Sequence, residues 1–299
     1  MSNKPDLPAA LARVREAGPS RPIGANVTEV HQNAHIVCYS GGESSALVAV
    51  EVFRKHGSNS LVLLNHDIHS RSEDPDIKRF KAEVAAFIGV PITYANMDRW
   101  DTKDQFDVVV EASAFKVGNG TALCTNRLKT EPFYGWLKTN GIDSTSVLYY
   151  GFERGEVARI QRRSSILAAM GYRTAFPLAH WDRTIMSTRE IGIEPPLTYG
   201  VFRHANCVGC LKAGMQHWYI VYYTRPDIWA RGLWAEEEIG YTIIQGHSLL
   251  ELTPKFEVMR LAGVPATERT PAAAFWKEAR RLVKLAEVEI ASLPCECTQ

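Results

Sequence analysis

The sequence predicts an α/β protein with a doubly wound, mainly parallel sheet and a helical C-terminal part. Up to about residue 182, short apolar runs alternate with amphipathic segments, which is the pattern of parallel strands joined by helical crossovers. The runs are apolar throughout, as expected for strands that are covered on both faces. Beyond residue 182 these runs fade, and amphipathic segments bounded by proline and glycine predict helices.

Five apolar runs predict strands at residues 35–39, 61–65, 91–95, 147–151 and 174–178. Amphipathic segments predict a helix that starts near residue 44 and helices over residues 75–88, 100–115, 131–139, 155–170, 215–223, 227–239, 254–262 and 272–292. We expect residues 1–33 to form a peripheral segment with a short helix over residues 7–16. We expect a sheet domain over residues 34–182 and a mainly helical part over residues 183–299, packed over the ligand-binding edge of the sheet.

Length and composition fit an ordinary globular protein, because 299 residues suffice for one large core or a core with a smaller subdomain. The net charge of +1 gives no overall basic field, so only local arginine clusters could favour nucleic acid. No apolar run approaches the roughly 20 residues of a membrane helix, and the N-terminal sequence lacks the apolar core of a secretory signal. We therefore expect a cytoplasmic protein with no membrane partner.

A glycine turn separates the first predicted strand from the helix that follows it. A helix that begins on glycines exposes unpaired backbone N–H groups at its positive dipole end, which favours an anion. Gly41 and Gly42 let the backbone approach a phosphate, and the hydroxyls of Ser40, Ser44 and Ser45 can donate further hydrogen bonds. The Walker pattern GxxxxGK[ST] is absent. The alternative is a strand–helix turn that merely contains two glycines.

Two further segments begin at the carboxyl ends of predicted strands, where ligands bind in open α/β sheets. Asn65 and Asp67 follow the second strand and are either nucleotide contacts or the polar residues of a turn or helix cap. The segment from Gly151 follows the fourth strand, and Glu156, Arg159 and Arg163 share one helix face there. The alternative for Glu156 and Arg159 is a weak surface salt bridge.

Cationic residues and cysteines mark two other segments. Arg127 and Lys129 would neutralise a polyphosphate beside the glycine turn, or lie at the solvated start of the helix over residues 131–139. The six cysteines are Cys38, Cys124, Cys207, Cys210, Cys295 and Cys297, and Cys38 is expected in the core. Cys207 and Cys210 have the spacing of two metal ligands, with His204 or His217 as a further ligand for zinc, or they are two packed thiols. Lys212 could balance thiolate or phosphate charge.

Four blocks in order resemble the phosphoadenosine phosphosulfate (PAPS) reductase-like family of the ATP pyrophosphatase superfamily, also called adenine nucleotide alpha hydrolases. Residues 40–45, SGGESS, are similar to the SGGxDS pyrophosphate (PP) loop, and residues 124–132, CTNRLKTEP, to C-x-x-R-K-x-x-P. Residues 151–159 are similar to G-x-x-x-x-E-x-x-R, and residues 206–214 to N-C-x-G-C-x-K-A-G. The resemblance covers about two thirds of the chain. This chain departs from it at Ser44, where many relatives carry Asp, at Thr125, where a second cysteine would align, and at Leu128, which separates the cationic pair.

The resemblance implies the HUP-type doubly wound fold, with ATP and magnesium bound at the carboxyl edge of the sheet. The residues it implies for catalysis are Ser40, Ser45, Arg127, Lys129 and Arg159. Those it implies for nucleotide binding are Ser40, Gly41, Gly42, Ser44, Ser45, Asn65, Asp67, Gly151, Glu156, Arg159, Arg163 and Lys212. It also implies an iron–sulfur cluster held by Cys124, Cys207 and Cys210 with an open iron site.

The leading functional hypothesis is cleavage of ATP between the α and β phosphates, with water or a nucleic-acid group activated for sulfur insertion as acceptor. The first alternative is reduction of a sulfonucleotide to sulfite, which would need a thioredoxin-type partner and a nucleophilic Cys297 in the tail. The second is a non-catalytic nucleotide-sensing module of a mobile-element or CRISPR-type effector complex. A homodimer is compatible with each of these.

Overall fold

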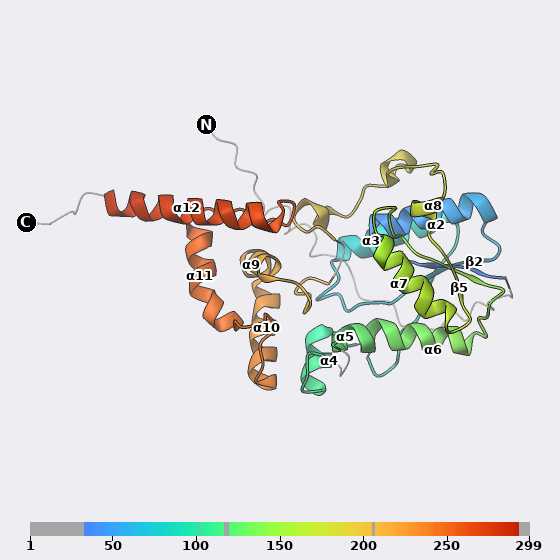
Figure 1. Ribbon diagram of the computed structural model, residues 1–299, viewed down its shortest axis with the longest axis horizontal. Coiled ribbons are helices and arrows are strands. Elements are labelled where there is room, and N and C mark those ends of the chain that lie inside the picture. Colours follow the sequence, from blue (N-terminus) through green and yellow to red (C-terminus); the bar gives the residue numbers. More distant parts are fainter. Residues whose placement is uncertain (1–32, 101, 117–119, 205–206, 293–299) are drawn as a thin grey trace, which may run out of the picture. The chain divides into compact units, whose positions relative to one another are not determined.

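The computed structural model describes residues 33–100, 102–116, 120–204 and 207–292, and it consists of two compact units (Figure 1). The described residues of the first unit are 33–100 and 129–197, and the rest belong to the second unit. The sequence predicts a sheet domain that ends near residue 182. The first unit continues to Leu197, and residues 102–128 belong to the second unit instead. The helix expected over residues 7–16 and the tail cysteines Cys295 and Cys297 lie outside the described residues.

A five-stranded, all-parallel sheet forms the centre of the first unit, as predicted. Its strands are β1 His35–Cys38, β2 Leu61–Asn65, β3 Ile92–Tyr94, β4 Val147–Tyr149 and β5 Arg173–Ala175. Their order across the sheet is β3-β2-β1-β4-β5. The chain therefore builds the sheet outward in one direction from β1 and then in the other from β4. The carboxyl ends of β1 and β4 flank the switch point at which doubly wound sheets bind ligands.

Helices cover both faces of this sheet (Figure 1). The helices of the first unit are α2 Glu43–His56, α3 Pro75–Ile88, α6 Glu131–Thr139, α7 Val157–Ala168 and α8 Pro177–His180. Side chains alternate along each strand, so Val37 packs in the core with α2 and α3 while its neighbour Ile36 packs in the core with α6 and α7. Leu63 packs in the same core as Val37, and Leu64 packs in the same core as Ile36. Both faces are therefore buried, which explains why the strands are continuously apolar.

Two features of the first unit differ from the sequence prediction. The last strand ends at Ala175 rather than continuing to residue 178, because Pro177 stands in the first turn of α8 and fixes a backbone angle suited to a helix. Strand β3 is limited to Ile92–Tyr94. The other predicted strands and helices of this unit agree with the structure to within about two residues at most ends.

The second unit is helical. Its helices are α4 Gln105–Glu111, α5 Leu123–Thr125, α9 Met215–Thr224, α10 Pro226–Ile239, α11 Leu249–Leu261 and α12 Ala272–Ser292. Trp218, Trp229 and Phe256 meet in its core, with ring centroids of successive pairs 6.2 and 5.7 Å apart. The predicted helix over residues 100–115 is the shorter α4, which begins at an Asp104 capping box. None of the described helices has both the length and the apolar character needed to cross a membrane.

Helix α11 starts earlier than the sequence indicated. Pro254 was expected to open this helix, but it lies inside it. The start is set instead by Ser248, whose hydroxyl accepts a hydrogen bond from the Glu251 backbone N–H while the Glu251 carboxylate accepts one from the Ser248 backbone. A capping box therefore outweighs the preference of proline for the first turn.

Two histidines stack at the amino end of the sheet. His35 opens β1 and His56 ends α2, and their ring centroids are 3.8 Å apart. The His35 Nδ1 atom lies 2.7 Å from the Tyr149 hydroxyl. Burial lowers the pKa of both imidazoles, and the nearby charges of Arg173 for His35 and Lys55 for His56 act in the same direction, as does His56 on His35.

Because the pKa values of these histidines are lower in the folded chain than their ordinary value of about 6.5, the unfolded chain binds more protons just below that pH. The contribution of the pair to stability is therefore complete above about pH 6.5 and decreases as the pH falls further. We expect the urea midpoint of His56→Gln to depend less on pH between 7 and about 5 than that of the natural chain. His180→Gln, which changes an exposed histidine outside the pair, is the control. A His56→Gln midpoint that follows the natural pH dependence would contradict this account.

Candidate functional site

The glycine loop between β1 and α2 has a backbone conformation that requires glycine. Gly41 has a φ of +87°, a region that L side chains rarely adopt. A Cβ atom at this position would also lie 2.8 Å from Lys81 Cδ and 3.0 Å from Ile77 Cγ2. Both neighbours belong to α3. The loop therefore lies directly against the stem of Lys81, a contact that only glycine permits.

Helix α2 begins at this loop without a side-chain cap. Its N-cap residue is Gly42, which has no side chain that could accept a hydrogen bond from the first-turn N–H groups. The buried Ser45 hydroxyl instead donates to the Gly42 carbonyl at 2.8 Å, and the Ser40 hydroxyl lies 3.3 Å from Ser45 Oγ. Ser45 thus stabilises the loop from inside, whereas Ser40 is exposed. The positive end of the α2 dipole lies at this loop, a position that favours an anion.

Glu43, the first residue of α2, places its carboxylate on another segment. Its Oε1 atom accepts hydrogen bonds from the Ser187 hydroxyl at 2.8 Å and from the Thr188 backbone N–H at 3.4 Å. The negative charge beside the loop is therefore compensated at the start of the 3-10 turn Thr188–Ile191. The Glu43 carboxylate is therefore directed to this turn by hydrogen bonds.

The loop after β4 touches the glycine loop. A Cβ atom on Gly151 would lie 2.9 Å from both the carbonyl carbon and the carbonyl oxygen of Ser44, and 3.1 Å from the backbone nitrogen of Ser45. Backbone atoms cannot move aside as a flexible side chain can. The two loops predicted to share one edge therefore meet at the switch point between β1 and β4, and Gly151 is the residue that allows their contact.

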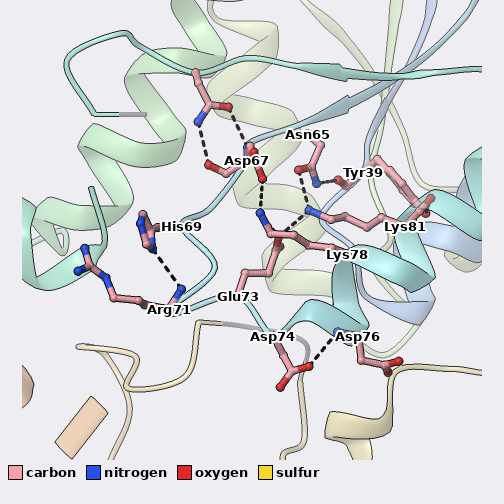
Figure 2. Close-up of polar contacts among 11 residues, drawn as sticks. Tyr39, Asn65, Asp67, His69, Arg71, Glu73, Asp74, Asp76, Lys78 and Lys81 are labelled. Atoms are coloured by element: carbon pink, nitrogen blue, oxygen red, sulfur yellow. Dashed lines mark hydrogen bonds and ion pairs between the residues drawn. The ribbon is translucent and has the colours of Figure 1, made fainter. Parts of the chain in front are cut away.

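A buried lysine, Lys81, packs against the glycine loop. Figure 2 shows its ammonium between Asn65 and Glu73. Lys81 is 0% exposed, and its ammonium lies 2.8 Å from the Glu73 carboxylate and 3.1 Å from Asn65 Oδ1. The Asn65 amide donates in turn to the Tyr39 carbonyl, and the Tyr39 hydroxyl donates to the Lys81 carbonyl at 3.1 Å. This network, Lys81–Glu73–Asn65–Tyr39, joins α3 and the end of β2 to the backbone immediately before Ser40.

Burial lowers the pKa of the Lys81 ammonium, and the Glu73 carboxylate opposes that shift. A charged pair in the interior is tolerated only when its hydrogen bonds are satisfied, and Asn65 supplies the additional one. Sequence analysis did not identify Lys81 or Glu73 as site residues. A signal was present, because Lys81 falls between Ile77 and Val84 on the apolar face of α3, where a lysine needs a buried partner.

The segment after β2 is fixed to the segment after β3. The Asp67 backbone N–H donates to Asn96 Oδ1 at 2.8 Å, and Asn96 Nδ2 donates to the Asp67 carbonyl at 2.9 Å. His66 Nδ1 lies 2.6 Å from the Ala95 carbonyl oxygen. The Asp67 carboxylate pairs with the Lys78 ammonium at 2.6 Å. Of the two residues predicted here, Asn65 is a buried support of the loop and Asp67 lies at the partly exposed edge.

The charged residues of α7 form contacts within the first unit. The Glu156 carboxylate accepts a hydrogen bond from the Glu153 backbone N–H at 2.8 Å and pairs with Arg159. The surface salt bridge that was the alternative interpretation of Glu156 and Arg159 is therefore present. The Arg159 guanidinium also lies over the Phe152 ring at 4.4 Å, and that of Arg163 lies over Tyr150 at 5.3 Å. Arg159 remains 64% exposed and accessible to a ligand.

The remaining predicted residues belong to two different units. Lys129 is in the first unit, and its charge contributes to lowering the pKa of His66. Those in the second unit are Cys124, Arg127, Cys207, Cys210 and Lys212. The structure brings the glycine loop, Asn65, Asp67 and Gly151 to one sheet edge. The second-unit residues belong to the other compact unit.

Protein hydrogen bonds hold the loop of Cys207 and Cys210. His217 Nε2 accepts from the backbone N–H groups of Gly209 and Cys210 at 3.2 and 3.3 Å, while its Nδ1 lies 2.7 Å from Glu268 Oε1. Both His217 nitrogens are thereby occupied, so this geometry does not support His217 as a zinc ligand. Among the residues that the structure describes, no three His, Cys, Asp or Glu side chains form a group that could hold a metal ion. The iron–sulfur cluster that the resemblance implies on Cys124, Cys207 and Cys210 stays a prediction, and no step below depends on it.

Comparison with protein-family models, with curated proteins and with solved structures gave no match to this chain. The functional argument therefore depends on the geometry of the first unit. Its central observation is the contact of two glycine-containing loops at the switch point of a parallel sheet.

The Gly151 contact gives a direct test of this geometry. Gly151→Ala would force a methyl group against the Ser44 backbone, and overpacking of this kind costs about 1–3 kcal/mol. Gly155→Ala is the matched control, because nothing lies within 4 Å of its Cβ position. We expect urea denaturation to show a loss of stability for Gly151→Ala alone. Equal stabilities of the two variants would show that the loops are not in contact.

The buried pair gives a second test. Lys81→Met retains most of the stem that packs on Gly41 but leaves the buried Glu73 carboxylate with only the more distant Lys78 ammonium, 4.0 Å away, which should cost about 3 kcal/mol of the free energy of unfolding. The double variant Lys81→Met/Glu73→Gln should recover most of this loss, measured by urea denaturation. Arg189→Met, which breaks the exposed pair with Glu194, should change stability by less than about 1 kcal/mol. A double variant no more stable than Lys81→Met would contradict the pairing.

Proposed function

We propose that the first unit binds ATP at the carboxyl ends of β1 and β4 and cleaves it to AMP and pyrophosphate. The observation that carries this proposal is the glycine loop at the switch point, with Gly41 at a positive φ and Gly151 in contact with the Ser44 backbone. The uncapped start of α2 supports an anion at this loop. The anion of this proposal is the triphosphate of ATP, placed at the switch point where doubly wound sheets bind ligands.

Charge around the loop supports the same proposal. The α2 dipole contributes partial positive charge at the loop, and the Lys81 ammonium behind it is paired with Glu73, so that this pair adds no net charge. Because Glu73 compensates Lys81 and Ser187 with Thr188 engage Glu43, no buried charge there is left without a partner to repel the phosphates. Arg159 and Arg163 add cationic groups on the β4 side of the edge.

The nucleoside half of ATP would then extend over β2 and β3. In doubly wound sheets the phosphates lie at the first strand–helix turn, and the ribose is bound by polar groups at the end of the next strand. Asp67 occupies that position, with its backbone fixed by Asn96. The rigid connection of these two segments favours a pre-formed site.

The chemistry requires positioning rather than covalent catalysis. In the simplest reaction a water oxygen attacks the α phosphorus, the bond to the oxygen bridging the α and β phosphates breaks, and a proton is released to solvent. The protein would hold the leaving pyrophosphate at the glycine loop through backbone N–H groups and the exposed Ser40 hydroxyl. Magnesium would enter with the phosphates of the substrate. A nucleic-acid group in place of water would be adenylated by the same displacement.

The test is ATP binding by calorimetry together with an assay for AMP and pyrophosphate in the presence of magnesium. Gly41→Ala should abolish binding, because its methyl group would meet Lys81 and distort the loop. The matched control is Gly57→Ala, which also changes a glycine of positive φ, 76°, but lies at the far end of α2 with nothing within 4 Å. This control should keep ATP affinity within about 2-fold.

Two outcomes would overturn the proposal. If the natural chain bound ATP but formed no AMP, the unit would be a nucleotide-binding module rather than a pyrophosphatase. If it bound no ATP, or if Gly41→Ala bound as tightly as Gly57→Ala, the glycine loop would not be the phosphate site.

A further inference from the structure

The side chain of His66 has one nitrogen engaged and one available. Its Nδ1 lies 2.6 Å from the Ala95 carbonyl oxygen. A carbonyl oxygen only accepts hydrogen bonds, so Nδ1 must carry the proton, and in the neutral ring Nε2 presents a lone pair. Among the described residues, Ala95 is the only hydrogen-bond partner of this ring. Nε2 is therefore an acceptor that none of the described residues uses.

The surroundings keep this ring neutral. Burial lowers the pKa of His66 to about 4, with the Ala95 hydrogen bond opposing the shift and the charges of Lys129 and Lys81 contributing to it. The acceptor is thus present throughout the physiological pH range. Its orientation is also fixed, because Asp67 and Asn96 exchange two hydrogen bonds immediately beside it.

His66 lies where the nucleoside half of a bound nucleotide would be. It directly follows β2, whose carboxyl end neighbours that of β1 in the sheet. With phosphates at the β1–α2 loop, the end of β2 is the position that faces the ribose and the base in doubly wound folds. A fixed acceptor at this place would select ligands that present a hydrogen-bond donor.

We propose that His66 Nε2 accepts a hydrogen bond from the nucleoside half of the bound nucleotide and thereby determines nucleotide selectivity. The inference rests on the proposed ATP site. Two groups of adenosine supply such a donor, the 6-amino group of the base and the hydroxyls of the ribose. An acceptor facing the 6-amino group disfavours a 6-oxo purine, because two lone pairs would then oppose each other.

Two substitutions separate the two ring nitrogens. His66→Asn places an amide near the position of Nδ1, so it can still donate to the Ala95 carbonyl while the acceptor at Nε2 is lost. His66→Gln extends an amide oxygen to the position of Nε2 and so retains an acceptor there. A selectivity change in the first variant but not in the second identifies Nε2 rather than the general loss of an imidazole.

The experiment measures dissociation constants for ATP, inosine triphosphate, 2′-deoxyATP and inorganic tripolyphosphate by calorimetry. Inosine triphosphate replaces the 6-amino group with an oxygen, and 2′-deoxyATP lacks one ribose hydroxyl. We expect the natural chain and His66→Gln to prefer ATP over one of these analogues by about 3- to 10-fold, the effect of one hydrogen bond. His66→Asn should lose that preference while its affinity for tripolyphosphate stays unchanged.

The outcomes distinguish the two proposals. Loss of the preference for ATP over inosine triphosphate assigns the donor to the base, and loss of the preference over 2′-deoxyATP assigns it to the ribose. If His66→Asn binds ATP with the natural selectivity against both analogues, or if tripolyphosphate affinity falls equally, the role of His66 is refuted although the ATP site stands. If the natural chain binds neither ATP nor tripolyphosphate, the proposed function itself fails.

Discussion

The pairing of Lys81 with Glu73 is the interaction on which the candidate site depends. An ammonium that is fully buried must keep its counter-ion and its further hydrogen bond to Asn65, because an unpaired charge in the interior is strongly destabilising. Glu73 and Asn65 can meet this need only when α3 is seated against the end of β2. The electrostatic requirement of one side chain therefore fixes the position of a whole helix relative to the sheet.

The conformation of the glycine loop follows from that arrangement. The stem of Lys81 lies in contact with Gly41, and the amide of Asn65 holds the Tyr39 carbonyl just before the loop begins. On the other side, the Gly151 loop lies against the Ser44 backbone. The loop is thus enclosed by packed atoms on two sides before any ligand arrives, which is the pre-organisation that an electrostatic phosphate site requires. Its rigidity comes from the scaffold rather than from the loop residues.

The sequence predicted the fold well because the fold depends on local patterns. The continuous apolar runs of β1 and β2 could only be strands buried on both faces, and the all-parallel sheet confirmed this. The end of β5 and the start of α11 were wrong, since a proline in one case and a capping box in the other decided the boundary. Lys81 and His66 could not be assigned from sequence, because their roles depend on partners 8 and 29 residues away. Those partners become neighbours only through the crossover connections.

The two sides of the β2 carboxyl end serve different purposes. Alternation along the strand turns Asn65 toward α3, where its amide is consumed by Lys81 and Tyr39. His66, the next residue, uses one nitrogen for Ala95 and keeps the other available. A residue whose hydrogen-bonding groups are all satisfied internally can support a site but cannot recognise a ligand. One that is half satisfied is held in place and still has an atom to offer. By this criterion Asn65 positions the glycine loop, whereas His66 has the free acceptor that the proposed discrimination between nucleosides requires.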